Sequence, residues 1–173
     1  MPSQVKSSRD DIINKLKEVP FFSMFAKDDS DMNKIADMCS NRSIKQGKEI
    51  ITEGDYGDEL FIILNGDIDI LKKTLQNEKY TVTTLSSDMG GINVGELALI
   101  DNDQRSASVV ANTDCVCLVI TRDAFVKFGD ENPYMGLQIT RAIASQLSSR
   151  LRKANSDIIT LFSALVEEIS DEE

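Results

Sequence analysis

Between residues 43 and 120 the sequence consists of short apolar runs that are separated by glycines and polar residues. Each run is too short for a helix of ordinary length, and Ile68-Asp69-Ile70 shows the apolar–polar alternation of a half-buried strand. Evenly spaced short strands with glycine turns predict an eight-stranded antiparallel β-roll, which is a jelly-roll-like architecture. The runs are residues 44, 50–51, 60–64, 68–70, 80–85, 107–111 and 115–120, and the glycines that separate the early ones are Gly47, Gly54, Gly57 and Gly66.

Helical patterns flank this region on both sides. Residues 8–18 have the apolar spacing of a helix, with Ser8 as its N-cap and Asp11 at the capping-box position. A second helical pattern follows Asp28, and Pro133 opens a long final helix in the first turn, where its missing N–H costs nothing. The fold class is therefore α+β and mainly β. We expect an N-terminal helical segment at 1–42, the β-roll at 43–131, a C-terminal lid or dimerisation helix at 132–170 and an acidic tail at 171–173.

The size and charge of the chain limit its partners. A length of 173 residues fits one domain with an extra element or two. Lys and Arg total 19 against 29 Asp and Glu, which gives a net charge of -10 and disfavours nucleic acid and anionic membranes, since both attract basic proteins. No apolar run approaches the roughly 20 residues of a membrane span, and the first residues lack the apolar core of a signal peptide. We expect a cytoplasmic protein.

Catalytic and metal chemistry find little support in the residue types present. The chain contains no histidine, which excludes histidine-based triads and the commonest transition-metal ligand. The acidic pairs Asp67 with Asp69 and Asp101 with Asp103 do not fit a calcium loop, so we interpret them as solvated turn and strand residues. We therefore predict a binding protein and not an enzyme. We predict no catalytic site and no metal site.

Residues 94–110 have the clearest potential for binding chemistry. Gly95 allows an anion to approach the backbone closely, and the first N–H groups of the short apolar stretch that follows point outward with the positive end of a helix dipole. Arg105 adds a planar fork of donors that fits two phosphate oxygens. Glu96 would repel a lone anion, but an ionised carboxylate accepts a hydrogen bond from a hydroxyl. This combination favours a 3',5'-cyclic nucleotide, which carries a phosphate and a free ribose 2'-OH close together.

The same segment also resembles a known family. Gly95-Glu96-Leu97-Ala98-Leu99, closed by Arg105-Ser106-Ala107, is similar to the phosphate-binding cassette of cyclic-nucleotide-binding domains of the catabolite activator and protein kinase A regulatory subunit type. Residues 53–66 also look like the family's strand-turn-strand segment with its recurring glycines. The resemblance covers about residues 12 to 158, and it implies a β-roll whose function is to bind cyclic nucleotide as a regulator or sensor.

The resemblance implies a role for each cassette residue. Gly95 and the N–H groups of Leu97 and Ala98 would hold the cyclic phosphate, and Glu96 would accept the ribose 2'-OH. Arg105 would neutralise the phosphate, while Ser106 would add a hydroxyl bond and Ala107 would complete the segment after the arginine. Val94 and Gln104 depart from the aromatic residue and the proline that are common in the family, but neither change removes a polar contact.

The choice of base depends on residue 106. In cyclic-GMP-dependent kinases a threonine at this place favours guanine, whereas the regulatory subunits that answer to cyclic AMP have alanine. The catabolite activator, which responds to cyclic AMP, has serine at this place, and Ser106 matches that serine. We expect cyclic AMP as the ligand, with cyclic GMP as the alternative.

The final helix carries an apolar seam with alternating spacings of three and four residues, which is the pattern of a coiled coil. Either this seam packs on its own domain or, as the resemblance implies, it makes a homodimer. The resemblance also implies that the helix closes over the base. Its register places Asn155 opposite the adenine, next to Ala154, which has no hydroxyl. We expect Arg141, Arg150, Arg152 and Lys153 to form a solvated face. The seam is Ala144, Leu147, Leu151, Ala154, Ile158, Leu161 and Leu165.

Two further interpretations remain open at this stage. A dimeric interaction module with a vestigial pocket would bind an unknown downstream protein through Ile158, Phe162, Val166 and Ile169. An enzyme such as a small-molecule hydrolase has no catalytic constellation in its favour. No helices for a DNA-binding domain follow the long helix, so the chain is expected to be either a free-standing sensor or a fragment.

Overall fold

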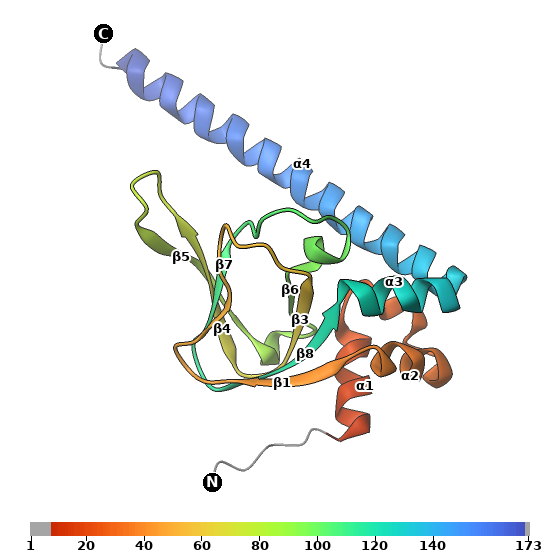
Figure 1. Ribbon diagram of the computed structural model, residues 1–173. Coiled ribbons are helices and arrows are strands. Elements are labelled where there is room, and N and C mark those ends of the chain that lie inside the picture. Colours follow the sequence, from red (N-terminus) through yellow and green to blue (C-terminus); the bar gives the residue numbers. More distant parts are fainter. Residues whose placement is uncertain (1–7, 172–173) are drawn as a thin grey trace.

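A computed structural model describes residues 8–171 of the chain (Figure 1). Ser8 accepts a bond from the N–H of Asp11 and donates its own N–H to the Asp11 carboxylate, so the predicted capping box is confirmed. Asp28 caps the second helix through the N–H groups of Ser30 and Asp31. The N-terminal helices are α1 (Arg9–Glu18), the 3-10 turn η1 (Ser23–Phe25) and α2 (Asp29–Asp37).

The eight strands of the described chain form two antiparallel sheets, which confirms the predicted β-roll. One sheet has the order β1-β8-β3-β6 and the other β2-β7-β4-β5. The first strand begins at Ser40, inside the segment 1–42 that was expected to be helical, so the β-roll starts slightly earlier than predicted. The strands are β1 (Ser40–Ile44), β2 (Glu49–Ile51), β3 (Glu59–Asn65), β4 (Asp67–Lys73), β5 (Lys79–Ser86), β6 (Asn93–Val94), β7 (Ser108–Ala111) and β8 (Cys115–Thr121).

Strands β3 and β8 are buried on both faces, which explains their unbroken apolar sequences. Leu60 and Ile62 face a core that is shared with the helices, whereas Phe61 and Ile63 face a second core between the two sheets. Residues on β8 alternate in the same way, because β8 pairs antiparallel with β3. The sheet that contains β3 and β8 is therefore packed against apolar side chains on both of its faces.

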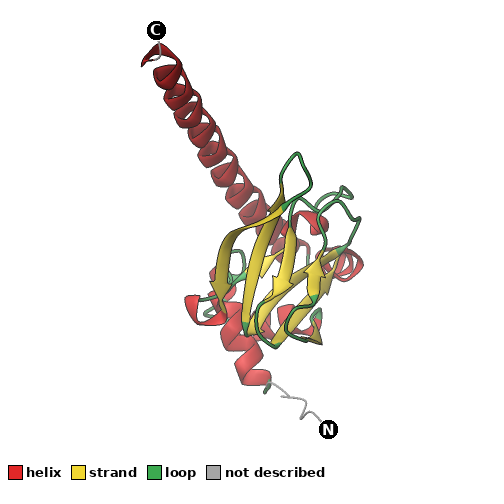
Figure 2. Cartoon of the chain, turned by 90° about the vertical axis from the view of Figure 1, so that its left-hand side faces the viewer, coloured by secondary structure: helices red, strands yellow, loops and turns green. Residues whose placement is uncertain are grey.

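The chain ends in two helices, α3 (Arg122–Glu131) and α4 (Pro133–Asp171). Thr121 caps α3 through the N–H of Ala124. The two helices meet closely, because a Cβ added to Gly136 would lie 2.6 Å from the Cα of Gly129. Helix α4 has 39 residues, so it is about 58 Å long, and its far half projects well clear of the β-roll (Figure 2). Within the described residues, none of the helices has the length and apolar character needed to span a bilayer.

Candidate functional site

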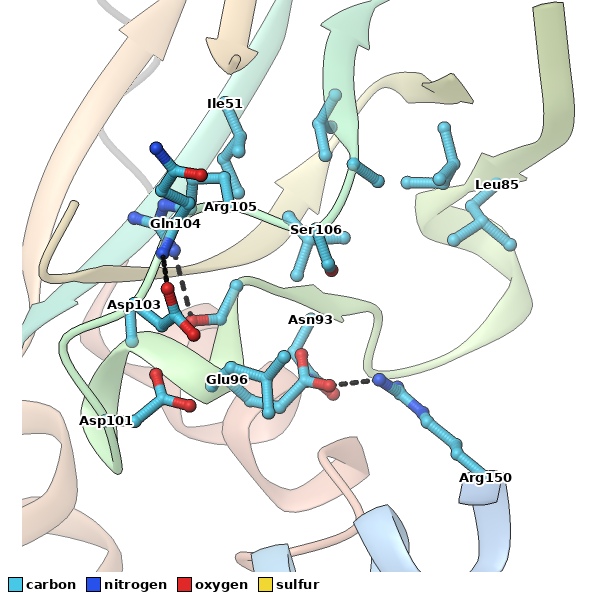
Figure 3. A pocket seen from close by; sticks show the side chains of 17 residues that line it. Ile51, Leu85, Asn93, Glu96, Asp101, Asp103, Gln104, Arg105, Ser106 and Arg150 are labelled. Carbon is cyan, nitrogen blue, oxygen red and sulfur yellow. Dashed lines mark hydrogen bonds and ion pairs between the residues drawn. The ribbon is translucent and has the colours of Figure 1, made fainter. Parts of the chain in front are cut away.

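A cavity of about 430 Å³ opens between the cassette, the inner faces of the strands and the middle of α4 (Figure 3). Seven of the eight predicted site residues line it, and they come from the 3-10 turn η3 (Glu96–Leu99) and the loop before β7. The seven are Gly95, Glu96, Leu97, Ala98, Arg105, Ser106 and Ala107. The eighth, Asn155, is exposed on α4 and does not line the cavity of its own chain.

Gly95 has a backbone conformation that only glycine adopts without strain. Its φ is 83°, in the left-handed region, and a Cβ would lie 2.7 Å from Nη1 of Arg105 and 2.9 Å from the Glu59 carbonyl oxygen. This conformation turns the chain into η3. The N–H of Ala98 donates to the Gly95 carbonyl oxygen at 3.1 Å, so an anion at this turn would share or replace an existing bond.

Arg105 is held in place by backbone carbonyls. Its Nη2 donates to the Glu59 carbonyl oxygen at 2.7 Å and its Nη1 to that of Gly95 at 3.3 Å. Burial lowers the pKa of the guanidinium, while the negative charges of Glu59, Asp58 and Glu96 oppose this shift. An arginine remains charged in either case. The site therefore presents a half-buried, oriented cation.

Glu96 and Arg150 form an ion pair that joins the cassette to α4. The Glu96 side chain is only 5% exposed, and Nη1 of Arg150 donates to its Oε1. Arg141, Arg150, Arg152 and Lys153 are all exposed, as predicted, but the contact of Arg150 with the cavity through Glu96 was not predicted. A buried carboxylate needs such a partner, because removing a charge from water is costly.

The remaining walls of the cavity were not predicted from the sequence. One wall is apolar; it consists of Ile51, Ile70, Leu85 and Val109. Asn93 lies beside Glu96, and its buried Nδ2 has no hydrogen-bond partner among the described residues. Asp101 and Asp103 are exposed, as expected, but they line the rim of the cavity. The signal that could have indicated Asn93 is a polar residue in an apolar context two positions before Gly95.

The model of the family described as "Cyclic nucleotide-binding domain" matches residues 41–132. A cAMP-dependent protein kinase regulatory subunit of Yarrowia lipolytica is 33% identical over 110 residues, which are 64% of this chain and 27% of that protein. The solved catabolite activator protein of Thermus thermophilus is 27% identical, with a TM-score of 0.70 over 82% of this chain and 62% of that one. The regulatory domain of Toxoplasma gondii protein kinase A, solved with cAMP, is 25% identical, with a TM-score of 0.62 over 73% of this chain and 46% of that one.

The chain thus spans less than two thirds of the length of each of these relatives. The family model covers more than half of the chain and includes the whole cassette. Its match agrees with the β-roll, with the buried Glu96 and with the oriented Arg105 in one cavity. The chain belongs to the cyclic nucleotide-binding domain family.

Proposed function

We propose that this chain binds cyclic AMP in the cavity beside η3 and that it acts as a regulatory sensor. The observation that carries the proposal is the presence of a buried carboxylate and an oriented guanidinium, Glu96 and Arg105, in one cavity of about 430 Å³. A cyclic nucleotide needs both groups, since it offers an anion and a hydroxyl donor on the same ring system. The volume lies within the range of pockets that enclose small ligands.

The phosphate would bind at Arg105. Its guanidinium already has two carbonyl partners, Glu59 and Gly95, so the fork needs little reorganisation to meet two phosphate oxygens. The exposed hydroxyl of Ser106 lies next in the chain and would donate a further bond. Gly95 leaves room for the anion to approach the backbone at this turn.

The ribose 2'-OH would donate to Glu96. A carboxylate has two oxygens with about four lone-pair sites, so it can accept from the hydroxyl and from Arg150 together. The base would then lie against the apolar wall. The Yarrowia lipolytica and Toxoplasma gondii relatives, which are a cAMP-dependent regulatory subunit and a domain solved with cAMP, support cyclic AMP as the ligand over cyclic GMP.

Signalling would proceed through α4. A ligand shared between Glu96 and Arg105 stabilises the position of η3 in which Glu96 holds Arg150, and so favours the docked form of the helix. Only a difference in ligand affinity between the docked and undocked forms drives such a shift. Self-association through α4, expected as a homodimer, would present this change to a downstream protein.

The test is the melting temperature of the purified protein with excess cyclic AMP, cyclic GMP or 5'-AMP. Ligand at about 100 times its dissociation constant adds about 2.7 kcal/mol of stability, which is several degrees for a domain of this size. We expect the largest shift with cyclic AMP, no shift with 5'-AMP, and loss of the shift in Arg105→Ala. No shift with either cyclic nucleotide would contradict the proposal and favour the interaction module with a vestigial pocket.

A further inference from the structure

The charged side chains that line the cavity carry more negative than positive charge. The cations are Arg105 and Arg150, and the carboxylates are Glu96, Asp101 and Asp103. Glu96 and Arg150 neutralise each other as an ion pair. This leaves Arg105 as the one remaining cation of the lining against two carboxylates. Sites that hold several phosphate charges carry an excess of Arg and Lys, so the lining of this cavity has the opposite balance.

Asp101 and Asp103 keep their full negative charge. Neither takes part in an ion pair within residues 8–171. Both are exposed at the rim of the cavity, in the segment between η3 and Arg105 (Figure 3). The Asp103 carboxylate accepts a hydrogen bond from the N–H of Gln104 at 2.7 Å, which fixes its position without neutralising its charge. Both carboxylates therefore repel an anion that enters the cavity.

Arg105 can balance one negative charge of a ligand and little more. Two carboxylates outside the lining, Glu59 and Asp58, already lie close enough to oppose the lowering of its pKa by burial. Glu59 is held by both guanidinium nitrogens of Arg42, but Asp58 belongs to no ion pair in the part of the chain that the structure describes. The residues that line the cavity include no lysine. A second negative charge on the ligand is therefore repelled by the rim without a cation to balance it.

We propose that Asp101 and Asp103 select ligands by charge, so that the cavity admits a phosphodiester with one negative charge and rejects nucleotides that end in a free phosphate. The inference rests on the proposed function, because it concerns the ligand of the same cavity. A cyclic nucleotide carries one negative charge, whereas a 5'-monophosphate carries about two near neutral pH. The two share their base and ribose, so neither Glu96 nor the apolar wall distinguishes them. Repulsion of the wrong ligand supplies the specificity that these shared contacts lack.

The test is competition against a fluorescent cyclic nucleotide at pH 8 and low salt. The competitors are cyclic AMP, 5'-AMP and the monomethyl ester of 5'-AMP, which has the same open phosphate as 5'-AMP but only one charge. The variant combines Asp101→Asn with Asp103→Asn, which removes both charges with little change of shape. Because repulsion scales with ligand charge, we expect affinity to rise about twofold to fivefold for cyclic AMP and the ester. For 5'-AMP we expect about the square of that gain, which is about fourfold to 25-fold.

The matched control combines Asp130→Asn with Asp157→Asn, which removes the same charge from exposed positions that do not line the cavity. In this control the ratio of the 5'-AMP and ester affinities should stay at its wild-type value. At about 1 M salt the gains of the rim variant should shrink, because the Debye length falls to about 3 Å. Equal gains for 5'-AMP and its ester, or the same change in the control, would overturn the inference alone. A wild type that binds no cyclic nucleotide would overturn the proposed function and this inference with it.

Discussion

The guanidinium of Arg150 holds the carboxylate of Glu96 across 54 positions of sequence, and this ion pair joins α4 to the turn that forms the cavity. Glu96 is 4% exposed, whereas the side chain of Arg150 is 54% exposed. The pair therefore has a buried end and a solvated end. A ligand hydroxyl that reaches Glu96 meets a carboxylate that is already oriented by the helix.

Removing Arg150 should weaken the docking of α4. Arg150→Ala leaves a buried carboxylate without its charged partner, which costs about 1–3 kcal/mol of unfolding free energy. Arg141→Ala, also on α4 but exposed, should leave it unchanged. Urea unfolding at one fixed protein concentration measures the difference, and amide hydrogen exchange of α4 near residue 150 should quicken only in Arg150→Ala. Equal unfolding free energies in the two variants would show that the pair does not stabilise the helix.

Glu96→Gln should reduce the ability of the protein to recognise the ribose hydroxyl. Hydrogen bonds to charged groups contribute about 1.5–3 kcal/mol, so we expect cyclic AMP affinity to fall by about tenfold to 150-fold. Calorimetric titration with cyclic AMP and 2'-deoxy cyclic AMP separates this contact from general damage. The wild type should prefer cyclic AMP strongly, and the variant should bind both nucleotides with similar affinity. A preference that is unchanged in Glu96→Gln would place the hydroxyl elsewhere.

Arg105→Ala should abolish most nucleotide binding. Truncating one partner of a buried charged contact costs about 2–5 kcal/mol, which is a loss of about 30-fold to several thousand-fold in affinity. Arg105→Lys keeps the charge but loses the planar fork, so its affinity should lie between those of the wild type and Arg105→Ala. Binding of a fluorescent cyclic nucleotide gives the three dissociation constants. If Arg105→Lys bound no better than Arg105→Ala, charge alone would contribute nothing at this position.

Acid should weaken the contact between β1 and β3. Both guanidinium nitrogens of Arg42 bond to the Glu59 carboxylate, and this holds the pKa of Glu59 below its ordinary value of 4.5. A lowered native pKa contributes stability above the unfolded-state value, and this contribution is lost as pH falls through the native pKa. The unfolding free energies of the wild type and Glu59→Gln should therefore differ most near neutral pH and converge below pH 4.5. Denaturant unfolding as a function of pH measures both curves, and a constant difference would contradict the prediction.

The sequence predicted most reliably the features that depend on nearby residues. The capping box at Ser8 and Asp11 and the turn at Gly95 were found because their chemistry lies within a few positions of the chain. The β-roll followed from strand length and glycine spacing, and the burial of β3 on both faces agrees with its unbroken apolar run. The first strand began earlier than expected because the polar residues from Ser40 to Arg42 pair along an exposed edge and give no apolar signal.

Contacts between distant segments could not be predicted in the same way. The rotation of α4 decides which of its basic residues faces the cavity, and that rotation is set by packing against α3 and the β-roll, including the contact of Gly136 with Gly129. Arg150 therefore looked like any other charged residue on a helix. Asn155 was assigned by a register that the sequence alone does not fix, and its contact with adenine stays a prediction.

The close contact of Gly129 and Gly136 provides a fixed point about which α4 can tilt as a rigid helix. Measured along the helix from Gly136, Arg150 lies about 21 Å away and Ile169 about 50 Å away. If the helix tilts as a rigid rod about this corner, a displacement of about 1 Å at Arg150 becomes more than 2 Å at Ile169. In such a tilt, a small displacement of Arg150 beside Glu96 produces a larger displacement at the C-terminal end of α4. The ratio of the two displacements grows with the length of helix that follows Arg150.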